Sequence, residues 1–421
     1  MSAERTSGGT RLPRLTSVDA LRGVAALLVL VFHTGRDVGP LSVLKPIAAF
    51  GWSGVGLFLV LSGFSIHFRW AASDVPHHRF TRRGFARRRF FRLYPTYLAV
   101  VALTVALTAA LGTSLTAPVP MVVAHGNIPG WLAIIEQILV FPGTLYTLPF
   151  VAVAWSLGLE IQIYAVYALL ITRLRRIGVV RIVLAALGIA LVWRVAAELV
   201  TTSVPVGQFL PGDHVTPLSR VFYGQVPSRA FEWFLGVLAA EAYFGRVKLP
   251  RITRSPLLAV ALLAVAALMF RFPVGLATLS GHMFHISDVL LDPLVGLGYF
   301  VVLQAMIDRE GWLLERATMR TLVRGLASVG LFSYSLYLLH PILLSVGERL
   351  IHDAGGGGMG ETVLVWAFVL ALAAVFSRVI ERPWITGAGD RWVADVIARR
   401  RAGRRPEPPS DLEPPGRPSA A

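Results

Sequence analysis

The sequence predicts an all-α, polytopic integral membrane protein with about ten transmembrane helices and both termini in the cytoplasm. Three observations support this prediction. The 421 residues are 55% hydrophobic and only 15% charged, with a mean hydropathy of +0.64, which is far from the balance of a soluble domain. Apolar stretches long enough to cross a bilayer recur along the chain. Arginines concentrate in alternate loops between these stretches.

The apolar stretches approach the roughly 20 residues that an α-helix needs to cross a bilayer. The first stretch follows three arginines, as the apolar region of a signal peptide would, but no small-residue cleavage site comes after it, so we keep it as a helix. The ten predicted spans are 17–35, 46–68, 93–112, 151–171, 180–200, 229–245, 256–271, 286–307, 326–347 and 361–381.

The loops alternate in charge. The loop after the second span contains eight arginines, whereas the loop 113–150 contains no Lys or Arg. Basic loops also follow spans four, six and eight, so the positive-inside rule places these loops and both termini in the cytoplasm. We expect three regions, namely a cytoplasmic N-terminal segment (1–14), a transmembrane domain (15–385) and a disordered Arg/Pro-rich cytoplasmic tail (386–421).

Several kinds of chemistry are excluded or unsupported. The chain has no cysteine, so it has no thiol nucleophile, disulfide or thiolate metal site. No HExxH metal motif and no GxSxG nucleophile motif is present. We expect no metal site, and we expect the His77–His78 pair and the His282 and His285 pair to be solvated in loops.

Span one contains the most informative pattern in the chain. Arg22 and His33 are eleven positions apart in an otherwise apolar segment, which places both side chains on one helical face, about 16 Å apart along the axis. Ionisable groups inside a bilayer are costly and mark functional sites by default. The alternative is that Arg22 marks the cytoplasmic helix end and His33 snorkels at the other end.

A cluster of arginines precedes span three in the segment RRRFFRLYPTY. Arg89 and Arg92 lie one helical turn apart, next to Arg88. Guanidinium groups bind phosphate bidentately, so the cluster suits a phosphorylated ligand at the cytoplasmic surface. A plain membrane anchor or a contact with anionic lipid explains the cluster equally well.

Span four carries Ser156, Glu160 and Tyr164 at four-residue intervals, on one stripe of a helix. A carboxylate in a membrane helix needs a partner. One interpretation is that Glu160 orients or charges a histidine or binds a sugar hydroxyl. The other is an interhelical salt bridge with an arginine. In span two, Gly63 and its neighbours are expected to permit close helix packing.

Two further spans contain polar residues. In span nine, Tyr337 and His340 lie within about two turns, and Pro341 is expected to free a backbone carbonyl because it has no N–H. For His340 a functional role and a structural, hydrogen-bonded role remain open. In span five, Arg194 and Glu198 are four apart and are expected to pair with each other.

Taken together and in this order, these segments resemble the membrane-bound acyltransferase family 3, which includes bacterial O-antigen and macrolide O-acyltransferases. The resemblance covers about residues 14–385. Its elements are Asp19 with the spacing from Arg22 to His33, GLFLVLSGF in span two, Arg89 and Arg92, Trp155 and Glu160 in WSLGLE, SRAFEWFLG near span six, SYSLYLLHP in span nine and ERP at 381–383.

The resemblance implies transfer of an acyl group, most often acetyl, from acyl-CoA to a hydroxyl of a carbohydrate or glycosylated metabolite, in the plasma (inner) membrane. Acetyl-CoA is then a co-substrate rather than a bound cofactor. The expected partners are acyl-CoA, the acceptor and the lipid bilayer, without nucleic acid. Many relatives carry an additional extracytoplasmic domain that is not seen in this sequence. The side of the membrane on which the acceptor is modified therefore stays open.

The expected roles follow from thioester chemistry, which needs a base for the hydroxyl and cations for the donor. His33 acts as that base or transiently carries the acyl group, with Asp19 or Glu160 as its charge partner. The donor phosphates are held by arginines. The expected catalytic residues are His33, Arg22, Asp19 and Glu160, and Arg22 also helps to hold the phosphates. The donor-binding residues are Arg88, Arg89, Arg92, Trp155 and Ser62, and the residues that bind the acceptor or support the site are Tyr164, Tyr337 and His340.

Two other classes of protein use similar residues. A transporter or flippase of glycosylated or lipid-linked molecules also places Arg, His and Glu inside the membrane. It would move its substrate without a covalent change. A non-catalytic sensor on the same scaffold is disfavoured by the presence of both Arg22 and His33.

Overall fold

The computed structural model describes residues 13–34, 48–72, 81–111, 153–201, 222–279, 282–353 and 358–385. The predicted loop 113–150 and the tail 386–421 lie outside the described residues, as does most of the N-terminal segment.

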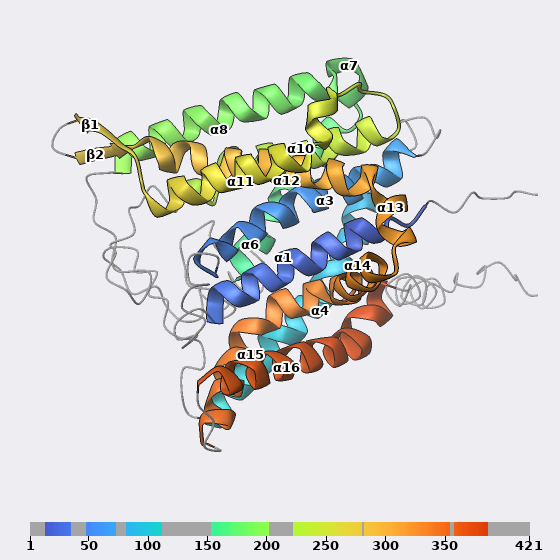
Figure 1. The fold of residues 1–421 in the computed structure, drawn as a ribbon, viewed down its shortest axis with the longest axis vertical. Helices are drawn as coiled ribbons and strands as arrows, with labels where there is room; N and C mark the ends of the chain where they lie inside the picture. Colours follow the sequence, from blue (N-terminus) through green and yellow to red (C-terminus); the bar gives the residue numbers. More distant parts are fainter. Residues whose placement is uncertain are drawn as a thin grey trace, which may run out of the picture.

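The described chain is helical apart from one short hairpin (Figure 1). Its elements are α1 (Thr16–Thr34), η2 (Phe50–Ser53), α3 (Gly54–Ala71), α4 (Arg82–Leu111), α6 (Ala154–Leu170), α7 (Leu174–Ile177), α8 (Val179–Thr201), α10 (Val226–Tyr243), η4 (Arg251–Arg254), α11 (Pro256–Arg271), β1 (Gly275–Leu279), β2 (His282–His285), α12 (Ile286–Asp308), α13 (Glu310–Glu315), α14 (Ala317–Gly330), α15 (Ser333–Asp353), α16 (Gly358–Phe376) and the π-helical turn η5 (Ser377–Glu381).

The helices confirm an all-α membrane protein at the level of architecture. Each of the ten predicted spans contains a helix. Among the described residues, six helices are long and apolar enough to cross a membrane, or seven if the bent pair α14 and α15 counts as one span. Helices α6 and α11 are apolar but shorter. The count of ten spans and the cytoplasmic termini therefore stay predictions.

Two local predictions are wrong. The predicted span 326–347 is broken, because α14 ends at Gly330, α15 begins at Ser333, and the two helices are bent by 69°. The segment around His282 and His285, expected to be a loop, contains strand β2, which pairs with β1 in an antiparallel hairpin.

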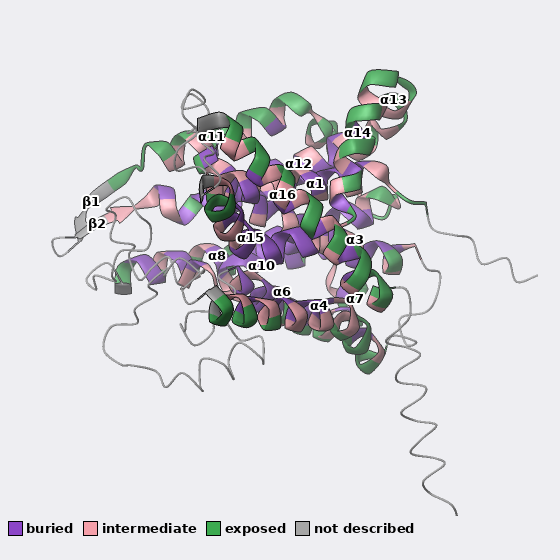
Figure 2. Cartoon of the chain, turned by 90° about the horizontal axis from the view of Figure 1, so that it is seen from below, coloured by how far each residue is buried: buried purple, intermediate pink, exposed green. Residues whose placement is uncertain are grey.

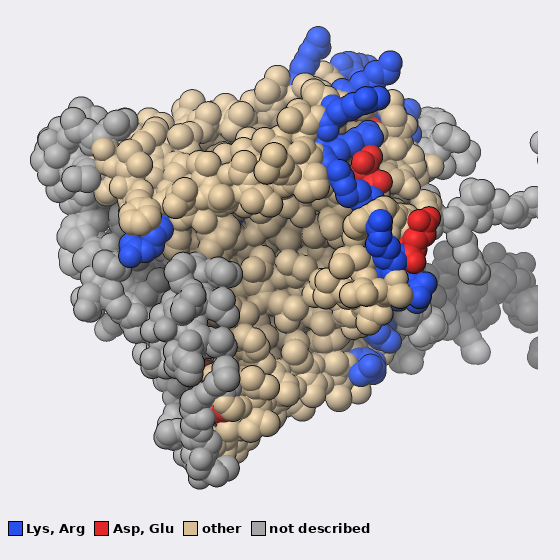
Figure 3. All heavy atoms as spheres, in the orientation of Figure 1, with Lys and Arg blue, Asp and Glu red and all other residues tan. Residues whose placement is uncertain are grey.

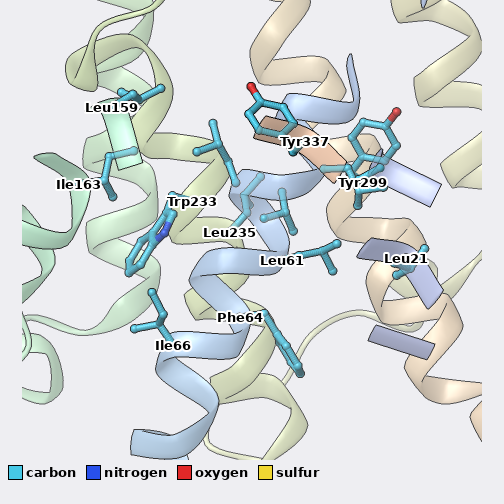
Figure 4. Close-up of a cluster of buried hydrophobic side chains, with 14 of the residues drawn as sticks. Leu21, Leu61, Phe64, Ile66, Leu159, Ile163, Trp233, Leu235, Tyr299 and Tyr337 are labelled. Atoms are coloured by element: carbon cyan, nitrogen blue, oxygen red, sulfur yellow. The ribbon is translucent and has the colours of Figure 1, made fainter. Parts of the chain in front are cut away.

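Helix α10 is the centre of the fold. Every residue from Ser228 to Glu241 is buried, and the helix packs against α3, α8 and α12 (Figures 1 and 2). Its Trp233 lies in the apolar cluster shared with α3 and α6 (Figure 4). A helix that is apolar on most sides is stable only when neighbours surround it.

Glycines allow α3 and α10 to touch along their backbones. A Cβ atom on Gly63 would lie 1.9 Å from the carbonyl oxygen of Trp233, and one on Gly236 would lie 2.0 Å from that of Val60. No larger residue fits at either position without moving a backbone. The predicted role of Gly63 in close packing is confirmed.

Helix α1 is fixed at its N-terminus by a carboxylate from α13. The backbone N–H of Thr16 and the hydroxyl of Ser17 donate to the two oxygens of Glu310 at 2.7 and 2.6 Å. An acid at this end satisfies free N–H groups and matches the helix dipole. This contact fixes the start of the helix that carries Arg22 and His33.

Candidate active site

A cavity of about 1340 Å³ lies between α1, α3, α4, α6, the junction of α14 and α15, and η5. It exceeds the roughly 300–1,000 Å³ of most small-ligand sites. Among the described residues that line it, seven arginines stand against three carboxylates, so this part of the lining is strongly cationic. These charged residues are Arg14, Arg22, Arg69, Arg88, Arg89, Arg92, Arg382, Asp19, Glu160 and Glu381.

The arginines come from helix ends that share one side of the molecule. They lie at the start of α1, the end of α3, the start of α4 and just after η5. On the face drawn in Figure 3, Lys and Arg side chains gather along the edge where α7 and α13 lie in Figure 1. The cavity therefore faces the side that the sequence assigns to the cytoplasm.

The structure brings the three predicted arginines of α4 to the cavity. Arg88, Arg89 and Arg92 all line it. The guanidinium of Arg89 lies 5.8 Å from the ring centre of Phe85 and 6.0 Å from that of Tyr164. Its Nε atom is buried and has no hydrogen-bond partner among the described residues. Arg89 therefore has donor capacity that the described protein does not use.

Arg22 lies in the cavity wall with a carboxylate beside it. Its Nη1 donates to Asp19 at 3.2 Å and its Nη2 donates to the Ser65 hydroxyl at 2.7 Å. Asp19 also accepts from Arg14 at 3.0 Å. Asp19 thus orients arginines, and the expectation that it is the charge partner of His33 is wrong.

The predicted stripe of α6 faces the cavity. Ser156, Glu160 and Tyr164 all line it, and Glu160 accepts hydrogen bonds from the hydroxyls of Ser62 and Tyr164. Ser62 also accepts from the indole N–H of Trp233 at 3.2 Å. Glu160 therefore accepts hydrogen bonds from two hydroxyl groups. Within the described residues it neither contacts His33 nor forms an ion pair with an arginine.

The inner end of the cavity is formed by Tyr337 of α15. Its hydroxyl forms a 2.6 Å hydrogen bond with that of Ser156, and the Phe58 ring packs edge-on against it with 5.6 Å between ring centres. The three side chains line the cavity where it approaches α15. Tyr337 therefore closes the cavity on the side of α15.

The two intramembrane histidines meet beyond Tyr337. His33 Nδ1 and His340 Nε2 are 3.2 Å apart, although the residues are 307 positions apart in the sequence. Neither histidine lines the cavity. The His33 side chain is exposed, whereas His340 is only 1% exposed. The partner of His33 is therefore a histidine from α15 rather than either predicted carboxylate.

Some cavity residues escaped the sequence analysis, and one predicted donor-binding residue lies elsewhere. Arg69, Arg382 and Trp384 line the cavity, and the Trp384 ring is nearly parallel to that of Phe91, at 7° with 6.1 Å between centres. Arg382 belongs to the ERP motif at 381–383, so this motif was the sequence feature that could have predicted it as a cavity residue. Trp155 does not line the cavity and packs against the apolar core instead.

A second group of charges lies outside the cavity, between α8, α10 and α12. Arg194 and Arg229 both pair with Asp292, and Arg229 also approaches Glu232 at 3.2 Å. All four side chains are buried, with residue exposures of 1–6%. We call Arg194, Arg229, Glu232 and Asp292 the closed charge cluster. It contains equal numbers of cations and acids.

The expected pairing of Arg194 with Glu198 is wrong. Arg194 binds Asp292 at 2.7 Å, while Glu198 accepts from the Tyr223 hydroxyl and from the backbone N–H of His285. Glu198, His285 and Asp288 have ligand atoms within 4.8 Å of one another, which is the geometry of a possible metal site. Both Glu198 oxygens already have protein donors, so the carboxylate is satisfied without a cation.

Comparison with known proteins defines the class of this chain. An acyltransferase-domain family model matches residues 15–382. The chain belongs to the membrane-bound acyltransferase family 3, and it is an enzyme of the O-acyltransferase kind. This membership decides against the transporter and sensor alternatives.

Among curated proteins, the chain is 27% identical to the acyltransferase MdmB of Streptomyces mycarofaciens, over 96% of this chain and 98% of that protein. It is also 27% identical to the putative membrane-bound transacylase BcsY of Komagataeibacter xylinus, over 92% of this chain and 86% of that protein. No solved structure matches the chain.

Proposed function

We propose that this acyltransferase moves an acetyl group from acetyl-CoA to a hydroxyl of a carbohydrate or glycosylated metabolite in the plasma (inner) membrane. The observation that carries the proposal is the charge of the cavity, where seven arginines face three carboxylates. Like charges gathered around one cavity repel one another, and a bound polyanion would relieve this repulsion. Coenzyme A carries a pyrophosphate and a further phosphate, and its binding would place the arginine-rich side in the cytoplasm.

We propose one orientation for the donor in the cavity. Arg88, Arg89 and Arg92 hold the phosphates, since the unused Nε–H of Arg89 is available for one of them. The parallel rings of Phe91 and Trp384 offer an apolar stacking surface for the purine. The thioester arm then extends past Ser62 and Glu160 toward Tyr337.

His33 supplies the base at the opposite end of α1. It takes the proton of the acceptor hydroxyl while the oxygen attacks the thioester carbonyl carbon. The C–S bond breaks, and His33 returns the proton to the departing thiolate sulfur. Because Tyr337 and Phe58 stand between the cavity and His33, we expect their side chains to shift when the acyl group passes. The exposed face of His33 receives the acceptor.

The experiment that tests this function is product analysis with purified protein in lipid nanodiscs. Acetyl-CoA and a panel of glycosides are incubated with the wild type, His33→Ala, and the Arg89→Ala/Arg92→Ala double variant. We expect the wild type to yield a product heavier by one acetyl group and His33→Ala to yield none. The double variant should react with a raised KM for acetyl-CoA.

Donor binding is measured in parallel by thermal unfolding with and without coenzyme A. A ligand at 100 times its Kd stabilises the folded state by roughly 2.7 kcal/mol. Substantial turnover by His33→Ala would remove His33 from catalysis. An absent thermal shift in the wild type at millimolar ligand would remove coenzyme A as the donor.

A further inference from the structure

The contact between His33 and His340 allows the protonation of both rings to be assigned. Each ring has one nitrogen beside a backbone carbonyl, which only accepts hydrogen bonds. His33 Nδ1 lies 2.9 Å from the Val29 oxygen, and His340 Nδ1 lies 2.8 Å from the Tyr337 oxygen. Each Nδ1 therefore carries a proton.

Pro341 explains why the Tyr337 carbonyl is available. In a regular helix this oxygen would accept from the backbone N–H of residue 341, four positions later, but proline has no N–H. Pro341 lies inside α15, and the freed carbonyl accepts from His340 instead. The sequence alone predicted that a carbonyl would be freed here, and the structure identifies its donor.

A neutral His340 with its proton on Nδ1 has a lone pair on Nε2. That lone pair faces His33 Nδ1 at 3.2 Å, so it accepts from the N–H that also reaches Val29. The proton of His33 is then shared between two acceptors on one side of the ring. His33 Nε2 is left without a proton, as a base requires.

We propose that His340 is a positioning residue that holds His33 in the tautomer whose Nε2 accepts the proton of the acceptor hydroxyl. This inference rests on the proposed function of His33. When Nε2 takes the proton, His33 becomes an imidazolium whose Nδ1–H points at the His340 lone pair. The contact strengthens with that charge, as carboxylate contacts do in hydrolytic triads. The return of the proton to the thiolate restores the starting tautomer.

Other groups around the two rings do not take over this role. The Tyr337 ring lies 5.9 Å from His340 between ring centres, and Phe32 packs edge-on against His33 at 5.0 Å. Within the described residues, no carboxylate forms a hydrogen bond or ion pair with either histidine. A neutral acceptor therefore orients the base without placing a buried charge next to it.

The test compares His340→Gln with His340→Leu in the acetyl-transfer assay. The glutamine amide oxygen can replace the Nε2 lone pair, whereas leucine removes it. We expect leucine to lower kcat on the order of 10²-fold and glutamine to restore it to within about 10-fold of the wild type. The KM for acetyl-CoA should stay unchanged, because His340 does not line the cavity.

A third variant separates positioning from folding. Pro341→Ala restores an N–H that competes with His340 for the Tyr337 carbonyl, and it also removes a helix-breaking residue. We expect a kcat lower by several-fold, up to about 10-fold, without any loss of thermal stability. This variant tests the proposal even if His340→Leu does not fold.

The matched control is His67, a second histidine that is 1% exposed. It binds Tyr167 at 2.9 Å and Glu241 at 2.6 Å, away from the cavity. His67→Gln should leave the kcat of the folded protein unchanged.

Equal kcat losses for glutamine and leucine would overturn the positioning role, as would a wild-type kcat for His340→Leu while His33→Ala is inactive. Activity of His33→Ala would overturn the proposed base itself.

Discussion

The closed charge cluster and the cavity are both rich in arginine, but they balance their charges in different ways. Arg194 and Arg229 share Asp292 and are accompanied by Glu232, so the cluster is neutral within the protein. In the cavity the arginines outnumber the acids by seven to three. The buried charges of the cluster are compensated within the protein, whereas the cavity keeps an excess of positive charge that an anionic ligand would reduce. Charge imbalance, rather than arginine content, therefore distinguishes the proposed binding site.

The largest change in the free energy of unfolding is expected from replacing Asp292, the acid that both arginines of the closed charge cluster share. Asp292→Asn leaves two buried guanidinium groups without their common carboxylate, which should lower the free energy of unfolding by about 3–5 kcal/mol. Chemical or thermal unfolding in detergent measures this loss. The charge-balanced double variant Arg194→Met/Asp292→Leu should recover most of it, since Arg229 keeps Glu232. If the double variant recovers none of the lost free energy of unfolding, the stability of the cluster depends on the shape of its side chains rather than on their charges.

The next effect is stabilisation by an anion that binds only the cavity. Adenosine 3′,5′-bisphosphate at 100 times its Kd should raise the free energy of unfolding by about 2.7 kcal/mol. The increment should be the same in the wild type and in the Arg194→Met/Asp292→Leu variant, because the two regions are independent. A smaller increment in that variant would show that the closed charge cluster and the cavity are coupled.

A smaller effect is expected from a single cavity arginine. Arg89→Gln removes one charge-assisted contact to the donor, which should weaken acetyl-CoA binding by about 2 kcal/mol, or roughly 30-fold. The free energy of unfolding without ligand should fall little or rise, because a like-charge repulsion is relieved. Calorimetric titration and unfolding of the same preparation measure both. A large loss of stability with unchanged affinity would assign Arg89 to the fold.

The smallest effect is expected at Arg83, an exposed arginine of α4 that does not line the cavity. Arg83→Gln should change both stability and donor affinity by less than about 0.5 kcal/mol. It is the matched control for Arg89→Gln, with the same helix and the same change of charge. A loss of affinity equal to that of Arg89→Gln would mean that general surface charge, rather than the cavity, attracts the donor.

Local spacing predicted much of the site correctly. Four-residue intervals placed Ser156, Glu160 and Tyr164 on one face of α6, and Arg89 and Arg92 share the same cavity. These predictions hold because residues in one helix keep their relative positions in any fold. The resemblance predicted the family, which the match over residues 15–382 confirms.

Spacing within one helix did not predict the correct interaction partner where that partner comes from another helix. Arg194 and Glu198 are at pairing distance along α8, yet each has a closer partner elsewhere. The partner of His33 is 307 residues away, and no local pattern encodes such a contact. The break before Ser333 was also missed, because the apolar pattern continues through it.

The glycine contacts between α3 and α10 have a mechanical consequence. Backbones that meet at Gly63 and Gly236 leave no side-chain layer between the two helices at these points, so we expect α3 and α10 to move together as one rigid body. One wall of the cavity is thus stiff. The facing wall includes α15, which begins after the bend at residues 331–332. Any widening that lets an acyl chain pass Tyr337 is therefore expected to come from a hinge rotation of α15 about that bend, while α3 stays in place.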